Sequence, residues 1–143
     1  MEIGLLLYPK VTQLDLTGVN ASRSNWLGVE AVELSADDAQ LSRVNFTGAT
    51  LRESALVKAN LSHALLVECD LSHSALIGAD LSQAQLDAAD LSHTKLDGAT
   101  FEGAVLKGVS FVKASAQRAN LQGATFKDTR WSGLNLKGAS YLS

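Results

Sequence analysis

A large apolar residue recurs at every fifth position of this chain, without a slip, from Val11 to Tyr141. All 27 positions of this register are apolar, and fifteen of them are Leu. Two residues before each of them the chain most often carries Ala, and neither position ever carries a charge. A repeat this short and this regular indicates a repetitive architecture, because each unit is too small to bury its own apolar side chains.

A period of five fits neither a long α-helix nor a long β-strand. On a helix, each step of five residues turns the apolar side chain by about 140°, and on a strand it alternates between the two faces. Neither element would then bury a continuous core. Within one repeat, however, the small and the large apolar residue are two positions apart, so a three-residue extended segment points both to the same side. The other two residues must turn a corner.

Glycine marks these predicted corners. Ten of the eleven Gly, from Gly18 to Gly138, stand at the second residue after the large apolar one. This spacing is typical of a type II turn, whose second central residue has φ > 0 and therefore favours Gly. The pattern predicts a polygonal coil with three residues to a side, two to a corner, and Leu and Ala inside.

The repeat is most regular between residues 59 and 101, in triplets such as Ala59-Asn60-Leu61 and Ala79-Asp80-Leu81. These residues resemble the pentapeptide-repeat family, whose pattern is A(D/N)LXX, over about nine-tenths of the chain. The resemblance implies an all-β fold: a right-handed quadrilateral β-helix of about 20 residues per coil and six to seven coils. The aromatic pair Trp26 and Phe46, which are 20 residues apart, agrees with that coil length. The family is abundant in bacteria, especially cyanobacteria.

The register predicts one β-helix over residues 11–143, preceded by an N-terminal cap segment over residues 1–10. Pro9 suits such an end, because it stops another strand from pairing with the first coil. The large apolar residues of the central coils are the predicted structural core: Leu61, Leu66, Leu71, Leu76, Leu81, Leu86, Leu91, Leu96 and Phe101.

Composition agrees with one compact soluble domain, since 46% of the 143 residues are hydrophobic and the net charge is -3. The single Cys69 falls at an inward small position, which predicts packing in a reducing compartment rather than a disulfide or a reactive thiol. The short apolar run at residues 5–8 lacks a basic lead and a cleavage site. We therefore expect no signal peptide, no membrane span and a cytoplasmic location.

Charges divide along the chain, with a net charge of -6 over residues 60–102 and +5 over residues 103–143. On a 20-residue coil four acids gather near one side, as a candidate acidic face for docking a partner: Glu68, Asp70, Asp87 and Asp90. A solvated surface is the simpler interpretation, because the family favours Asp or Asn just before the large apolar residue.

Several outward positions are apolar. Val57 and Ile77 would stack on one corner, and Leu65, Val67 and Val105 would share another side. Scattered apolar side chains are normal on a protein surface, whereas a contiguous patch would indicate a contact site.

The three histidines, His63, His73 and His93, each close a Leu-Ser-His triplet at a corner, and His73 and His93 would stack one coil apart beside Glu53. Two His and a carboxylate could hold a metal, but an outward corner lacks a fourth ligand and supporting partners. We predict exposed spacer residues. Nor does any Ser, His or Asp stand with a base and an orienting group, so we expect no catalytic, cofactor or metal site and no enzyme activity.

The expected function is a rigid, non-catalytic scaffold for protein–protein interaction, perhaps best described as regulatory. The last coil has no covering segment, so an end-to-end homodimer through the C-terminal coil is a further expectation. The resemblance implies an alternative, because some family members inhibit and protect DNA gyrase by imitating duplex DNA. That imitation requires about one negative charge per 1.7 Å, which the basic C-terminal third does not supply. Direct nucleic-acid binding is not expected, since the basic end lacks interleaved exposed aromatic residues.

Overall fold

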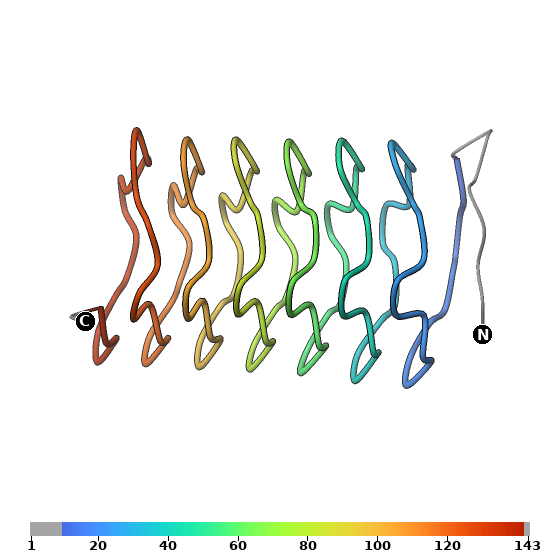
Figure 1. Cartoon of the computed structure of the whole chain (residues 1–143), viewed down its shortest axis with the longest axis horizontal. Helices are drawn as coiled ribbons and strands as arrows, with labels where there is room; N and C mark the ends of the chain where they lie inside the picture. Colours follow the sequence, from blue (N-terminus) through green and yellow to red (C-terminus); the bar gives the residue numbers. More distant parts are fainter. Residues whose placement is uncertain (1–9, 142–143) are drawn as a thin grey trace.

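The structure is a computed structural model that describes residues 10–141, so all but Lys10 of the predicted cap segment lies outside the described residues. Within this range the chain forms no α-helix, and its β-structure consists of single paired residues rather than longer strands. None of its described segments is a helix long and apolar enough to cross a bilayer. The chain winds through stacked coils that build a rod, which Figure 1 shows from the side.

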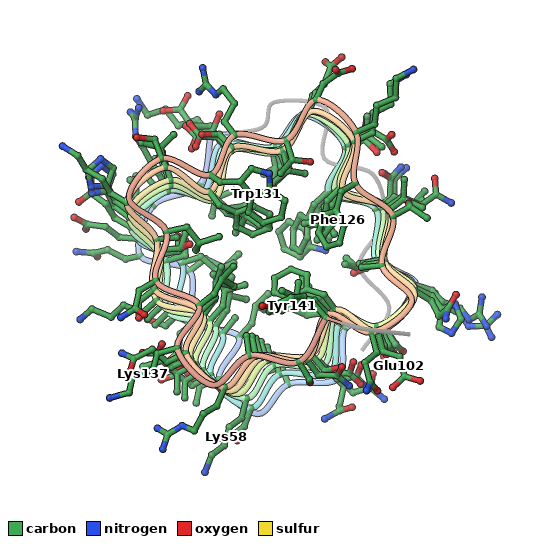
Figure 2. The ribbon with its side chains drawn as sticks, turned by 90° about the vertical axis from the view of Figure 1, so that its left-hand side faces the viewer. Lys58, Glu102, Phe126, Trp131, Lys137 and Tyr141 are labelled. Carbon is green, nitrogen blue, oxygen red and sulfur yellow. The ribbon has the colours of Figure 1, made fainter. Side chains whose placement is uncertain are left out.

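The backbone pairing fixes the length of each coil. Each residue just before a large apolar one pairs in parallel with the residue 20 positions later, beginning with Lys10 and Glu30 and ending with Asn120 and Ser140. One coil therefore takes 20 residues, which is four repeats of five. Figure 2 looks along the rod and shows the four-sided outline that results. The coil length of the sequence prediction is thus present in the backbone itself.

Hydrogen bonds join each coil to the coils before and after it. The N–H of Leu81 donates forward to the carbonyl of Thr100 at 2.7 Å, and the N–H of Asp80 donates backward to Ala59 at 2.9 Å. A third bond, from the N–H of Ala84 to the carbonyl of Leu81 at 3.1 Å, closes the corner. The forward N–H groups of any coil consequently need the carbonyls of the coil that follows.

The corners adopt the predicted turn conformation whether or not they contain glycine. The second corner residue has a positive φ at every repeat from Gln13 to Gly138, including 60° at His73 and 59° at Ala88. A left-handed conformation costs a residue with a side chain about 1–2 kcal/mol. Each such corner is held by the next coil, as where the N–H of His73 donates to the carbonyl of Ser92 at 3.0 Å.

The large apolar side chains fill the inside of the rod. The nine predicted core residues, from Leu61 to Phe101, are all buried. Cys69 is buried beside them as a free thiol. Burial raises the pKa of the Cys69 thiol, and the negative charge of Asp70 adds to this effect. The interior is therefore apolar enough to keep this thiol protonated.

A column of buried hydroxyl groups interrupts the apolar interior on one side of the rod. Ser54, Ser74 and Thr94 take the small inward position in three successive coils and are buried. Ser54 Oγ accepts the N–H of Leu34 at 3.1 Å, and Ser74 Oγ accepts the N–H of Ser54 at 3.0 Å. Ser74 Oγ also donates to the carbonyl of Leu51 at 3.1 Å. Among the described residues no buried side-chain nitrogen or oxygen lacks a partner.

Candidate functional site

The last described coil leaves the apolar interior of the rod open to solvent. Its aromatic residues Phe126, Trp131 and Tyr141 are 39%, 38% and 57% exposed, whereas the corresponding positions of the central coils are buried. Figure 2 looks onto this end and shows the three labelled rings pointing toward the centre of the square. We call this surface the open coil and define it by Phe126, Trp131, Leu136 and Tyr141.

The open coil surrounds a hollow of about 430 Å³, which is also lined by Leu121 and Leu134. Its aromatic wall is fixed by packing rather than free to rotate. Trp131 stacks on Phe111 of the coil beneath, with ring centroids 5.5 Å apart, and its ring lies 5.1 Å from that of Phe126. A preformed apolar hollow of this size falls within the range of about 300–1,000 Å³ found for binding pockets.

Backbone donors surround this hollow. In the coil beneath, the N–H groups of Phe101 and Leu121 donate forward, each at 2.6 Å, to carbonyls of the coil that follows. The corresponding N–H groups of Phe126, Trp131 and Leu136 have no further coil to bond within residues 10–141. The open coil therefore offers hydrogen-bond donors beside its apolar side chains.

Three exposed cations stand around the same end. Lys127, Arg130 and Lys137 are each the chain neighbour of an inward apolar residue. Figure 2 shows Lys137 pointing away from the rod. None of the three is in an ion pair with another described residue. Asp128 is the only acid in residues 103–141, so the rim of the open coil is basic.

The four acids of the candidate acidic face do lie together. Asp70 and Asp90 pair across neighbouring coils, and the N–H of Glu68 donates to the carbonyl of Asp87 at 2.8 Å. The Asp70 carboxylate, however, accepts the N–H and the hydroxyl of Ser72 at 3.0 and 2.6 Å. Such local bonds hold a turn. Asp70 thus stabilises its own corner, and nothing in this geometry assigns the four acids a ligand.

The outward apolar residues do not form a contiguous exposed patch, which corrects the sequence expectation. Ile77 is 39% exposed, but the other four are only half-buried: Val57, Leu65, Val67 and Val105. Gln85 separates Leu65 from Val105 in the backbone ladder. The reason is that outward side chains of successive coils lie directly over one another, so each covers part of the next. Leu27, which the pattern did not single out, is exposed.

The stacked histidines lie as expected from the 20-residue coil. The rings of His73 and His93 are 4.6 Å apart and nearly parallel, at 6°, and line a shallow hollow with Glu53. A metal bound by imidazole lies in the plane of the ring, so two parallel rings one coil apart cannot share one ion. No group of three potential ligands within residues 10–141 is placed to hold a metal.

Two family models match the chain. One describes a pentapeptide repeat region and covers residues 39–115, and the other describes pentapeptide repeats in eight copies and covers residues 12–52. The chain belongs to the pentapeptide-repeat family. The five-residue register from which its coils are built is therefore the register of this family.

Solved structures of other pentapeptide-repeat proteins resemble this one. Rfr23 from the cyanobacterium Cyanothece 51142 is 24% identical, with 96% of this chain and 89% of that chain covered and a TM-score of 0.37. HetL from Nostoc sp. strain PCC 7120, involved in heterocyst differentiation regulation, has the same identity and coverage and a TM-score of 0.27. A trypsin-treated QnrB1, a plasmid-mediated fluoroquinolone resistance protein, is 14% identical over 100% of this chain and 84% of that chain, with a TM-score of 0.41. No curated protein sequence matches this pentapeptide-repeat protein.

Proposed function

We propose that this pentapeptide-repeat protein is a rigid, non-catalytic scaffold that binds a protein partner through its open coil. The observation that carries the proposal is the exposed cluster of Phe126, Trp131 and Tyr141 around a preformed hollow. Trp and Tyr are enriched among the residues that dominate binding energy at protein interfaces. The packed rings lose little side-chain freedom when a partner binds, which favours affinity. A cytoplasmic location, the sequence expectation, is compatible with this role.

The regular backbone supports a scaffold rather than a catalyst. Forward and backward hydrogen bonds repeat in every coil, so a side chain on one side of the rod keeps its distance from side chains on the next. Most polar side chains project outward in separate columns, and the hydroxyls that face inward are bonded to the backbone. A regulatory role through binding fits this arrangement.

The alternative of gyrase inhibition by DNA imitation finds less support in the charge distribution. A duplex carries negative charge along its whole length. Here the acids are concentrated over residues 60–102, and the C-terminal end of the rod is basic. A supercoiling assay with purified gyrase separates the two functions, and inhibition at low micromolar concentration of this protein would favour the alternative.

Affinity capture with point variants tests the scaffold proposal. We expect a protein from the source organism to be retained by the native chain and lost on Trp131→Ala and on Tyr141→Ala. Leu27→Ala is the matched control, because Leu27 is an exposed apolar residue near the other end of the rod. The retained protein is then purified, and its affinity for each variant is measured directly. Circular dichroism checks that the variants keep the fold.

Two results would contradict this proposal. One is a partner that both open-coil variants retain as well as the native chain does. The other is the absence of any protein retained above the background of an unrelated solenoid protein.

A further inference from the structure

From the surroundings of the hollow we infer that the partner at the open coil is an acidic amphipathic protein segment. Its apolar side chains would fill the hollow, and its carboxylates would face the basic rim formed by Lys127, Arg130 and Lys137. This inference rests on the proposed function and adds the chemistry of the partner. Three independent features of the open coil support it.

The first feature is apolar and concave. The hollow of about 430 Å³ is lined by three aromatic rings and three leucines. An interior of this kind accepts two or three large apolar side chains, since proteins pack apolar groups closely and leave few voids. The partner must therefore present a stripe of such residues.

The second feature is the sign of the charge around it. Each rim cation stands next in the chain to an inward apolar residue, as Lys127 does to Phe126 and Arg130 to Trp131. Whatever fills the hollow comes close to these cations. The net charge of +5 over residues 103–143 makes the potential at this end positive and favours an acidic partner.

The third feature is the set of backbone donors. The forward N–H groups of Phe126, Trp131 and Leu136 lack a further coil within the described residues. A protein segment supplies carbonyl and carboxylate acceptors to such donors. A buried N–H without an acceptor costs about 1–3 kcal/mol, so a ligand that offers none binds less well.

These features weigh against a second copy of the chain as the occupant. In an end-to-end homodimer two basic rims would face each other, as would the N–H donors of two open coils. A lipid surface fits the positive charge, but acyl chains offer no acceptor to backbone donors at the edge of a concave hollow. The acidic amphipathic segment is the occupant that matches all three features.

The test uses the full chain and three synthetic peptides without Trp. The first carries a Leu and Phe stripe opposite Glu residues, the second has the same stripe opposite Lys, and the third is a scrambled form of the first. Binding is followed by Trp131 fluorescence and by calorimetry, and the buried Trp26 supplies a constant background. We expect the acidic peptide to bind at least about tenfold more tightly than either of the others, and its affinity to fall between 50 and 500 mM NaCl.

Variants locate the effect on the chain. Reversing the rim with Lys127→Glu, Arg130→Glu and Lys137→Glu together is expected to weaken the acidic peptide at least about tenfold. Lys58→Glu is the control, because Figure 2 shows Lys58 projecting from the outer surface, away from the open interior. Unchanged thermal unfolding of the rim variant confirms that it is folded.

Equal binding of the acidic and basic peptides would overturn the inference. So would binding to phosphatidylglycerol vesicles but to no peptide, or a dimer in sedimentation equilibrium that Trp131→Ala dissociates. A captured protein that depends on Trp131 but is insensitive to reversal of the rim would overturn this inference alone and leave the scaffold function standing.

Discussion

At the scale of single residues, the corner is the position that most constrains this chain. Every second corner residue from Gln13 to Gly138 is left-handed, yet most of them are not glycine. A side chain there carries a conformational cost that the hydrogen bond to the next coil offsets. The corner is therefore a place where the sequence can change at small cost and where charges such as Glu68 are presented to solvent.

Substitutions at two corners test this balance. Gly48 has a φ of 68° and no atom that an added Cβ would meet within 4 Å, so only backbone strain changes in Gly48→Ala. We expect this change to lower the free energy of unfolding by about 1 kcal/mol. The reverse change, Ala88→Gly at a φ of 59°, is expected to leave stability unchanged or raise it slightly. Urea unfolding measures both, and equal effects of the two changes would contradict the argument.

Cys69 provides a second prediction at this scale. Because burial raises the pKa of its thiol, we expect no reaction with a thiol reagent at pH 8 until the chain unfolds. The folded state favours the protonated form, so its contribution to stability is complete below the unfolded pKa of about 8.5 and declines as pH rises above it. A Cys69→Ala variant should lack that decline. Rapid labelling of the native protein would show that the coil opens at this position.

At the scale of the coil, the buried hydroxyl column is the element that departs from a purely apolar interior. Ser54, Ser74 and Thr94 stand where neighbouring sides carry Ala, and the first two accept backbone N–H groups across coils. The column thus links successive coils through side chains as well as through the backbone ladder.

Removal of one hydroxyl tests that role. In Ser74→Ala the N–H of Ser54 loses its acceptor inside the rod, which we expect to destabilise the fold by about 1–3 kcal/mol. Ser92→Ala removes a hydroxyl of the same kind from an outward, half-buried position, and less than about 0.5 kcal/mol is expected there. Chemical denaturation of the two variants gives the comparison. A loss at Ser74 no larger than that at Ser92 would mean that the interior tolerates the unpaired donor.

The sequence register predicted which side chains face inward, because that depends only on the phase of each residue. Leu61 and Trp131 share this phase, but only Leu61 is buried. Burial also depends on whether another coil follows, and no local pattern around Trp131 carries that information. The half-burial of Val105 likewise depends on the residues one coil away, 20 positions apart in the chain. The basic C-terminal third was visible in the sequence, but its position around an apolar hollow was not.

At the scale of the whole rod, stability should vary from coil to coil. Each coil contacts only its neighbours, so the stability of a solenoid is a sum of nearest-neighbour terms. The N–H of Arg130 donates to Val109 at 2.9 Å in the open coil, as the N–H of Asp90 donates to Cys69 at 2.9 Å in the middle. We expect amide exchange at least about tenfold faster at Arg130, because its coil is packed on one side only. Uniform protection along the rod, measured by NMR, would contradict this expectation.

The parallel pairing of residues 20 apart also determines how such a molecule can change length. Duplication of one whole coil moves everything beyond it along the axis by about 4.8 Å and leaves every side facing as before. An insertion of five residues instead rotates all that follows by a quarter-turn, and any other length breaks the phase. The rod is therefore a ruler graduated in coils, on which evolution can adjust the separation between two bound molecules without redesigning either contact.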